Sequence, residues 1–469
     1  MKIAFHTLGC KVNQYETQAL KEKFLQRGYE IANEGDYADI YVINTCTVTG
    51  LSDRKSRQYI RRVKKINPDS ITAVIGCFAQ VSPEEAKSIE GVNIVAGTNE
   101  KNNLPEYIED YIKGNGCASS SLCSLLSVLP SQASLGQKGN GVECYIKDFE
   151  ELTEYEDTGI ITSMDSRTRA YIKIQEGCDQ FCSYCIIPYA RGAVRSRAKA
   201  DIIKEAESLI EKGFKELVLT GINTALYGME QGYKKEDRDE VYGIEIIVKA
   251  INELPGDFRI RLGSLEPNVI NAAYVKRLLK YKRLCPHMHL SLQSGSDRIL
   301  RLMNRNYDSS DYMELINTLK RHDKGYGITT DIIVGFPGET EEDFKDSINI
   351  VKGAGLCKVH VFKYSKREGT KAANMKDHLS PEVKSRRSAE LIKVAEEVSG
   401  QFFVKNLGTS RTVLIEQYNE RTGYLEGMSE NYIKVYCQGD KILCNRFVNV
   451  ELINLYKDGV KGKIKGMEI

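Results

Sequence analysis

Strand-like and helix-like segments alternate through the middle of the chain. Six apolar segments have strand character: YIKIQ, ELVLTG, RIRLGSLE, HMHLSLQSG, TTDIIVGFPGE and KVHVFKYS. Amphipathic stretches such as ADIIKEAESLIEKG separate them, as in βα units with a parallel sheet. Six such units predict a partial or complete β/α barrel, whose chemistry would lie at the carboxyl ends of its strands. Those ends carry Gly221, Ser264, Ser294, Gly295 and Asp331.

The regions before and after this βα stretch have different sequence patterns. The first 76 residues contain KIAFHTL, DIYVINT and SITAVIG between helix-like runs, which predicts an open, mostly parallel α/β sheet. Residues 114–140 are rich in Ser and Gly and lack a period, which indicates a linker or insertion. The short β-rich pieces after residue 401 predict a small all-β barrel. We therefore expect an α/β protein with an N-terminal α/β domain (1–113), a linker (114–163), a β/α barrel (164–400) and a C-terminal β-barrel (401–469).

Composition limits the surroundings and the partners. The chain has 66 basic and 64 acidic residues, so a nucleic-acid surface would have to be a local patch. The start, MKIAFHTLGC, lacks a long apolar run, and no later run approaches the roughly 18 apolar residues of a membrane span. We expect a cytoplasmic protein without membrane contact. Thirteen cysteines in a reducing compartment predict metal binding or catalysis.

A compact cysteine motif follows the first predicted strand of the barrel. GCDQFCSYC places Cys178, Cys182 and Cys185 within eight residues. Zinc ordinarily takes four ligands, commonly with a second Cys or His pair further along, and no such pair lies nearby. An iron–sulfur cube held by three thiolates keeps one iron open for a small molecule. The motif therefore predicts an iron–sulfur cluster with an open iron.

Three further cysteines each end a predicted strand of the N-terminal sheet. Cys10 ends KIAFHTLGC, Cys46 ends DIYVINTC and Cys77 ends SITAVIGC. Any one alone could be a small buried apolar residue. The carboxyl ends of parallel strands, however, converge on one crevice. We therefore expect these thiols to lie together and to hold a second cluster with its own open iron, facing the first.

Together these features resemble one known family. The barrel motif, with Tyr184 before its last cysteine, is similar to the radical S-adenosylmethionine motif. Two open clusters followed by a small C-terminal barrel resemble the methylthiotransferase family over nearly the whole chain. The resemblance is carried by LGCKVNQYET, NTCTVT, GCFAQ, CSYCIIPYARGAVRSR and LSLQSGSDRILRLMNR. LGCKVN followed by QYE, and IIPYARG after the third barrel cysteine, look most like the branch that modifies N6-threonylcarbamoyladenosine in tRNA.

The resemblance implies a role for each cysteine set. The barrel cysteines would hold a [4Fe–4S] cluster that donates an electron to S-adenosylmethionine, giving methionine and a 5′-deoxyadenosyl radical. The N-terminal cysteines would hold an auxiliary [4Fe–4S] cluster that carries the sulfur. The radical would remove hydrogen from C2 of the adenine at tRNA position 37, next to the anticodon, and this carbon would take the methylthio group. Because the cofactors supply the chemistry, we assign no catalytic acid or base.

Small and aromatic residues near the barrel strands are candidate cofactor contacts. The resemblance places Tyr184 beside the adenine of S-adenosylmethionine. Gly221 in LTGIN and Ser294 and Gly295 in LQSGS follow strands, where small side chains let a nucleotide or methionine approach the backbone. Ordinary turn glycines and a helix N-cap are the alternative explanation. We predict these four as cofactor-binding residues.

Basic residues beside both cysteine sets are candidate RNA contacts, because lysine and arginine bind phosphates. A solvated helix face is the alternative for DRKSRQYIRRVKK. The C-terminal barrel looks like the TRAM module, which binds tRNA, and its Tyr418, Tyr424 and Tyr432 could stack bases. The predicted phosphate contacts are Arg57, Arg61, Arg62, Arg191, Arg195 and Arg197.

Alternative functions keep parts of this interpretation. The same chemistry could act on isopentenyladenosine in tRNA or on an aspartate of a ribosomal protein. A different class would be an RNA-binding iron–sulfur redox sensor without turnover. The methylthiotransferase interpretation also requires an electron donor such as flavodoxin or ferredoxin, and a sulfur donor that the sequence does not identify. We interpret Cys117, Cys123 and Cys144 as incidental thiols.

Overall fold

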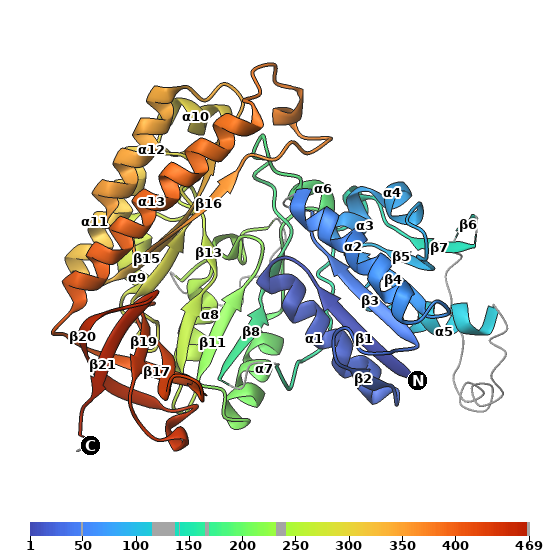
Figure 1. Cartoon of the computed structure of the whole chain (residues 1–469), viewed down its shortest axis with the longest axis horizontal. Helices are drawn as coiled ribbons and strands as arrows, with labels where there is room; N and C mark the ends of the chain where they lie inside the picture. Colours follow the sequence, from blue (N-terminus) through green and yellow to red (C-terminus); the bar gives the residue numbers. More distant parts are fainter. Residues whose placement is uncertain (48–49, 115–136, 140, 165–167, 231–240, 467–469) are drawn as a thin grey trace. The chain divides into compact units, whose positions relative to one another are not determined.

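The computed structural model describes residues 1–47, 50–114, 137–139, 141–164, 168–230 and 241–466 (Figure 1). These residues form two compact units. Unit 1 comprises residues 1–161, 176–180 and 186–195, and unit 2 comprises residues 162–175, 181–185 and 196–469. The segment that contains the barrel cysteines is therefore divided between the units.

Unit 1 is built on a seven-stranded sheet. Its strand order is β2-β1-β3-β4-β5-β7-β6, and all neighbouring strands are parallel except β6 and β7. The predicted open, mostly parallel sheet is confirmed. The strands are β1 (Lys2–Thr7), β2 (Glu30–Ala32), β3 (Ile40–Thr45), β4 (Ile71–Gly76), β5 (Ile94–Ala96), β6 (Gln137–Gly139) and β7 (Val142–Tyr145).

Helices cover both faces of this sheet because successive strand residues point to opposite sides. Ile40 and Val42 pack with α1 and α5, whereas Tyr41 and Ile43 pack with α2, α3 and α4. The strands read as continuous apolar runs, as expected for a parallel sheet buried on both faces. The helices of unit 1 are α1 (Lys11–Gln26), α2 (Gly50–Ile66), α3 (Cys77–Val81), α4 (Pro83–Lys87), α5 (Leu104–Gly114), η2 (Phe149–Glu151) and α6 (Ile187–Arg191).

Part of the predicted linker belongs to the sheet. Residues 142–145 form β7, which pairs in parallel with β5, and β6 adds an antiparallel edge. The linker prediction for 114–163 is therefore wrong for this stretch. Its alternating pattern, VECY, is short and follows directly on the Ser- and Gly-rich sequence, which favours a linker. Cys144 lies in β7, while Cys117 and Cys123 lie outside the described residues.

The larger part of unit 2 contains the six predicted βα units. Its strands pair in parallel as β8-β11-β12 and β13-β14-β15-β16, with the break between β12 and β13 at Gly263. Each predicted strand segment is present. The bounds are β8 (Arg169–Lys173), β11 (Glu216–Thr220), β12 (Arg259–Leu262), β13 (Ser264–Leu265), β14 (His287–Leu290), β15 (Gly327–Val334) and β16 (Lys358–Lys363), with short strands β9 (Gln175–Glu176) and β10 (Arg195–Ser196).

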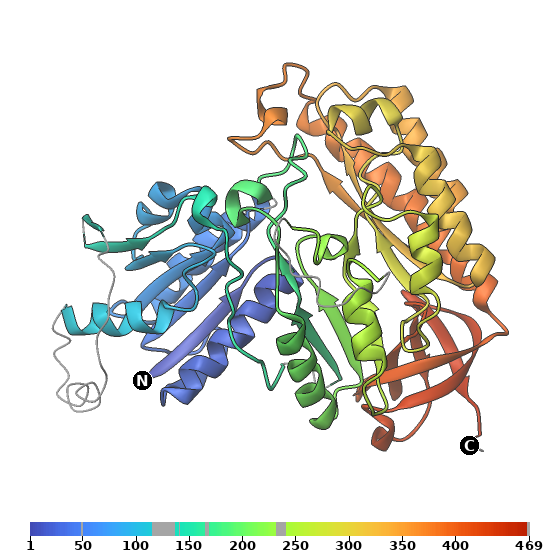
Figure 2. The same ribbon diagram turned by 180° about the vertical axis from the view of Figure 1, so that it is seen from behind.

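Amphipathic helices lie along these strands (Figure 2) and bury their apolar faces in one large core. Ile202 and Leu209 of α7 and Leu315 and Leu319 of α11 belong to that core. The helices are α7 (Lys199–Glu211), η3 (Thr224–Leu226), α8 (Glu245–Asn252), α9 (Ala272–Leu278), α10 (Asp297–Leu302), α11 (Ser309–His322), α12 (Glu341–Ala354), η4 (Lys371–Asn374) and α13 (Pro381–Asn406).

The C-terminal strands close into a five-stranded barrel, in the order β17-β18-β19-β21-β20. The small barrel is confirmed, but α13 continues past the predicted boundary at residue 400 and ends at Asn406. Among the described helices, none combines the length and apolar character that a bilayer crossing requires. The barrel elements are β17 (Ser410–Asn419), β18 (Tyr424–Ser429), β19 (Lys434–Cys437), η5 (Lys441–Leu443), β20 (Phe447–Tyr456) and β21 (Gly459–Ile464).

Candidate active site

The three N-terminal cysteines lie at one edge of the unit 1 sheet. Cys10 follows β1, Cys46 follows β3 directly, and Cys77 begins α3 at the end of β4. Strand β1 lies between β2 and β3, so the chain changes direction at this point of the sheet. Open α/β sheets bind ligands outside the carboxyl ends of the strands at such a switch point. The predicted common edge is confirmed.

A glycine allows the Cys10 loop to approach Cys46. Gly9 has φ +107°, and a Cβ atom there would lie 2.6 Å from Cys46 Cβ and 2.9 Å from its Sγ. A side chain at this position would therefore collide with a predicted ligand. Cys10 is exposed, yet the surrounding protein raises the pKa of its thiol; Arg191 lowers it and nearby Cys77 raises it further.

Asn13 ties the loops that carry these cysteines together. Its Nδ2 donates to the carbonyl oxygens of Leu8 at 2.7 Å and Thr45 at 2.9 Å. In return Asn44 Nδ2 donates to the Asn13 carbonyl oxygen at 3.0 Å. Asn13 Oδ1 lies 4.0 Å from Cys10 Sγ. One buried amide thus fixes the backbone after β1 against the backbone at the end of β3.

Arg191 fills the space beside this cysteine set and is fully buried. Its Nε donates toward Cys77 Sγ at 3.4 Å. Nη1 donates to Glu16 at 2.8 Å and to Glu176 at 2.5 Å, while Nη2 donates to Asn13 Oδ1 at 2.8 Å and to Glu16 Oε2 at 3.2 Å. Burial opposes the charged form, but Cys77 and the two carboxylates outweigh it and hold the pKa of Arg191 well above its ordinary value.

The barrel cysteines are held by turns in both units. In unit 1 the Cys178 N–H donates to the Gly192 carbonyl at 3.0 Å, and Gly177 has φ +72° with the Ala193 carbonyl oxygen 1.7 Å from where a Cβ would lie. In unit 2 the Cys185 N–H donates to the Cys182 carbonyl at 2.9 Å. That the two cysteine sets face each other remains a prediction.

Tyr184 takes part in a charged network of unit 2. Its hydroxyl accepts a hydrogen bond from Arg305 Nη2 at 2.5 Å, and Arg305 Nη1 forms an ion pair with Glu266. The Arg305 guanidinium also lies 5.9 Å from the Tyr307 ring centroid. Burial raises the pKa of the Cys182 thiol, and the nearby Arg305 charge lowers it. Arg305 therefore contacts Tyr184, the predicted adenine contact, and also lowers the thiol pKa of Cys182, a predicted cluster ligand.

The small residues at the other strand ends have packing reasons to be small. A Cβ at Gly221 would lie 2.9 Å from Gln175 Oε1, which accepts from the backbone N–H groups of Ile222 and Asn223. A Cβ at Gly295 would lie 2.5 Å from Ser347 Cα of α12. Ser294 Oγ accepts from the Ser296 N–H at 3.3 Å. Packing thus explains these residues, and their contact with a cofactor remains a prediction.

Three of the six predicted phosphate contacts need correction. Arg191, Arg195 and Arg197 are 0%, 3% and 1% exposed. Arg195 donates to the carbonyl oxygens of Leu152 and Arg191, and Arg197 pairs with Glu205. Buried guanidinium groups with internal partners cannot reach a phosphate.

The helix after Cys46 fits the RNA prediction better. Arg61 and Arg62 of α2 are exposed. Arg57 is 37% exposed at its side chain and forms an ion pair with Glu85. Its guanidinium carbon also lies 5.8 Å from the Phe78 ring centroid. Arg61 and Arg62 are therefore the two exposed arginines of this set, and they remain proposed phosphate contacts.

The tyrosines of the C-terminal barrel differ in their surroundings. The ring of Tyr432 stacks on His287 with centroids 4.2 Å apart, and Arg261 lies 5.2 Å from its centroid. Base stacking on Tyr432 is therefore excluded in this arrangement. On another part of the barrel, Lys461 lies 5.0 Å from the Tyr424 centroid and 4.4 Å from that of Tyr456. Tyr424 and Lys461 line a groove with Tyr436 and Lys463.

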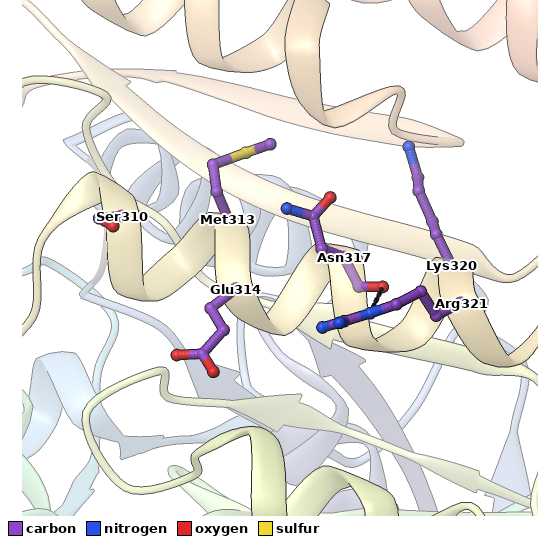
Figure 3. A pocket seen from close by; sticks show the side chains of 6 residues that line it. All are labelled: Ser310, Met313, Glu314, Asn317, Lys320 and Arg321. Carbon is purple, nitrogen blue, oxygen red and sulfur yellow. Dashed lines mark hydrogen bonds between the residues drawn. The ribbon is translucent and has the colours of Figure 1, made fainter.

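Two further features carry no assignment. His289, Asp331 and His360 offer ligand atoms within 4.8 Å of one another. His289 Nε2 is 3.1 Å from Asp331 Oδ2 and its Nδ1 is 2.9 Å from Thr329 Oγ1, so hydrogen bonds account for the closeness of His289 and Asp331. A groove along α11 is lined by side chains of that helix alone (Figure 3), so no second element contributes chemistry to it.

Comparisons with known proteins agree with this architecture. A sequence-family model described as the radical SAM superfamily matches residues 172–351. A second family model, described as uncharacterized protein family UPF0004, matches residues 2–97. Radical S-adenosylmethionine methyltransferase TsrM from Kitasatospora setae has a TM-score of 0.56 at 14% identity, over 79% of this chain and 77% of its own. This likeness shows the fold.

Curated relatives extend over nearly the whole chain. This chain is 37% identical to the threonylcarbamoyladenosine tRNA methylthiotransferase MtaB of Bacillus subtilis, over 96% of this chain and 93% of the relative. MtaB of Aquifex aeolicus is 36% identical, with 94% and 98% covered. The tRNA-2-methylthio-N(6)-dimethylallyladenosine synthase of Alkaliphilus oremlandii is 31% identical, with 99% and 92% covered.

Fold and cysteine motif together define a radical S-adenosylmethionine protein that carries an additional three-cysteine α/β domain. The chain belongs to the methylthiotransferase family, within the threonylcarbamoyladenosine branch. Membership implies S-adenosylmethionine and [4Fe–4S] clusters as cofactors.

Several site residues were not predicted from the sequence. Asn13 and Glu16 follow Cys10 in α1, where they read as ordinary helix positions. Glu176 precedes Cys178, and Arg305 ends LSLQSGSDRILRLMNR. Their proximity to the cysteine motifs was the available signal, since polar residues within a few positions of metal ligands often orient them.

Proposed function

We propose that this chain is an enzyme that inserts a methylthio group at C2 of N6-threonylcarbamoyladenosine in tRNA. The observation that carries the proposal is the convergence of Cys10, Cys46 and Cys77 at one sheet edge, in a chain that also has the radical motif. The substrate rests on identity: 37% and 36% to the threonylcarbamoyladenosine enzymes against 31% to the dimethylallyladenosine enzyme.

The residues present fit the implied cofactors. Cys178, Cys182 and Cys185 would hold one cluster, and the three N-terminal cysteines would hold the auxiliary cluster. When bound, these groups and S-adenosylmethionine supply the radical chemistry that replaces a hydrogen by a methylthio group. The chain's own residues orient the ligands: Asn13 fixes the Cys10 loop, and Arg305 holds the Tyr184 hydroxyl. No side chain needs to remove the unactivated C2 proton.

Two surfaces support tRNA binding. Arg61 and Arg62 are exposed on α2, the helix that follows Cys46, where they would hold phosphates of the tRNA. The barrel groove with Tyr424 and Lys461 combines an aromatic face with a positive charge, as in proteins that stack bases of single-stranded RNA. We assign docking of the tRNA to this groove.

The cellular compartment and the reaction partners that we propose follow from the cluster chemistry. Thiolate ligands of iron–sulfur clusters suit a reducing cytoplasm, where disulfides do not persist. Reduction of the clusters requires an electron donor such as flavodoxin or ferredoxin. The reaction also requires a sulfur donor.

The test is mass spectrometry of tRNA nucleosides from cells that lack this chain. We expect the methylthio form of threonylcarbamoyladenosine to disappear and to return with the wild-type chain. A matched control restores the cells with the Cys10→Ala, Cys46→Ala, Cys77→Ala variant, which should leave the unmethylthiolated nucleoside. Loss of the isopentenyladenosine product instead would refute the substrate. A chain that releases no 5′-deoxyadenosine from S-adenosylmethionine after anaerobic reduction would favour the redox sensor.

A further inference from the structure

Arg191 is a buried cation beside a predicted cluster ligand, in a place where an RNA contact was expected. It lies six positions after Cys185, in the segment 186–195 that belongs to unit 1. A guanidinium group has five N–H donors in a fixed fork. Here Nε has one acceptor, Cys77 Sγ, and the two terminal nitrogens have four acceptor contacts. The side chain is thus held in a single orientation.

We propose that Arg191 is a positioning residue of the auxiliary site, which orients the Cys77 sulfur and supplies the positive charge that sets the reduction potential of the cluster. The proposal rests on the assignment of Cys10, Cys46 and Cys77 to that cluster. Hydrogen bonds to the sulfur atoms and the net charge nearby are the main protein influences on such potentials.

The charge balance around Arg191 explains why its effect is not screened. Glu16, Glu176 and Lys101 are also fully buried, and Lys101 forms an ion pair with Glu16. Arg195 is also buried and lies 3.9 Å from Glu176. Three cations therefore face two carboxylates away from water, where charges interact more strongly than at the surface. Three thiolates add further negative charge when the cluster is bound. Without Arg191, the two carboxylates would face the cluster with Lys101 beside Glu16 and the more distant Arg195 beside Glu176.

The sign of the effect follows from this arrangement. Reduction adds one negative charge, so a nearby cation favours the reduced state and a nearby anion disfavours it. Arg191→Met should therefore lower the potential. Glu176→Gln should raise it, because it removes an anion that Arg191 now balances. Arg191→Lys keeps the charge but lacks the planar fork, so it should lie between Arg191→Met and the parent. If Arg191 and Glu176 were needed only for packing, Arg191→Met and Glu176→Gln would not shift the reduction potential in opposite directions.

The experiment uses the full chain with Cys178, Cys182 and Cys185 replaced by Ala, so that only the N-terminal cysteines can hold a cluster. Each variant is built in this parent, reconstituted anaerobically, analysed for iron, and titrated redox-potentiometrically with electron paramagnetic resonance detection. We expect Arg191→Met to change the one-electron reduction equilibrium at least tenfold, which corresponds to about 59 mV. Glu176→Gln should change it in the other direction.

An iron-loaded Arg191→Met variant with the parent's potential would overturn the proposal. If that variant binds no iron, Glu176→Gln and Arg191→Lys decide, and unchanged potentials in both would overturn it as well. A parent that binds no iron would refute the auxiliary cluster and the proposal with it. A negative nucleoside assay would instead refute the substrate and leave the potential shifts standing.

Discussion

The hydroxyl of Tyr184 accepts a hydrogen bond from Arg305 at 2.5 Å, although 121 residues separate them in the sequence. Arg305 is itself held by an ion pair with Glu266, and its side chain is 4% exposed. The aromatic residue before the last barrel cysteine is therefore not free to rotate away. This relationship makes the orientation of Tyr184, and not only its ring, part of the proposed S-adenosylmethionine site.

Removing this restraint should weaken S-adenosylmethionine binding. For Arg305→Met we expect the Kd to rise about tenfold, because a hydrogen bond to a charged group contributes about 1.5–3 kcal/mol. Tyr184→Phe keeps the ring and should have a smaller effect than Tyr184→Ala. Equilibrium dialysis on the reconstituted enzyme measures the affinity, with the iron content as control. An Arg305→Met variant with full iron and unchanged Kd would contradict the proposed role.

Replacing one cysteine set should leave the chemistry of the other measurable. With Cys10, Cys46 and Cys77 changed to Ala, the iron content should fall to about half, since one of two four-iron clusters is lost. Cleavage of S-adenosylmethionine to 5′-deoxyadenosine should persist, whereas methylthiolated product should be absent. Iron analysis and chromatography of the reaction products check both points. Product formed by this variant would show that the auxiliary cluster is assigned wrongly.

Much of the fold could be predicted, and so could the common sheet edge of the three N-terminal cysteines, because both depend on short-range patterns. Cys10, Cys46 and Cys77 are far apart in sequence, yet each follows an apolar strand, and parallel strands bring such ends together. Burial of charge follows no comparable pattern. Arg191 resembles an exposed basic residue until Glu16 and Glu176 are seen around it.

The same limit applies to aromatic residues. Tyr424 and Tyr432 lie eight positions apart in equally polar surroundings, but only Tyr432 meets a ring and a guanidinium from the β/α part of unit 2. Contacts between elements far apart in the chain decide which tyrosine remains available. The extension of the sheet by β7 was missed for a related reason, since its pairing partner β5 lies about fifty residues earlier.

The barrel groove predicts how tRNA affinity should respond to substitution. Tyr424→Ala should weaken binding by about 1–3 kcal/mol if one base stacks there. Lys461→Ala should reduce the slope of log K against log salt by about one. Ile442→Ala is the matched control, because Ile442 is 64% exposed on the same barrel but does not line the groove. Filter binding at several salt concentrations gives both quantities, and equal losses in all three variants would argue against the groove.

Glu216 at the start of β11 joins the two parts of unit 2. It is fully buried and is paired with Arg169, Arg259 and Arg261. Arg261 also donates to the Ser429 carbonyl oxygen at 3.3 Å, which belongs to the C-terminal barrel. Despite burial, which would raise it, the three arginines hold the pKa of Glu216 well below its ordinary value of 4.5.

Glu216→Gln should therefore destabilise the fold by about 3–5 kcal/mol at neutral pH, because it leaves buried arginines without their anion. A lowered folded pKa stabilises the protein fully above about pH 4.5, and this contribution is lost as the pH falls toward the folded value. The difference between wild type and variant should thus be constant from pH 8 to 5 and shrink below. Urea unfolding of the cluster-free chain, followed by circular dichroism, measures it. Glu416→Gln is the matched control, because Glu416 is a part-exposed partner of Arg169, and this change should lower the free energy of unfolding by about 1 kcal/mol or less. A similar loss of stability in both variants would contradict the special role of Glu216.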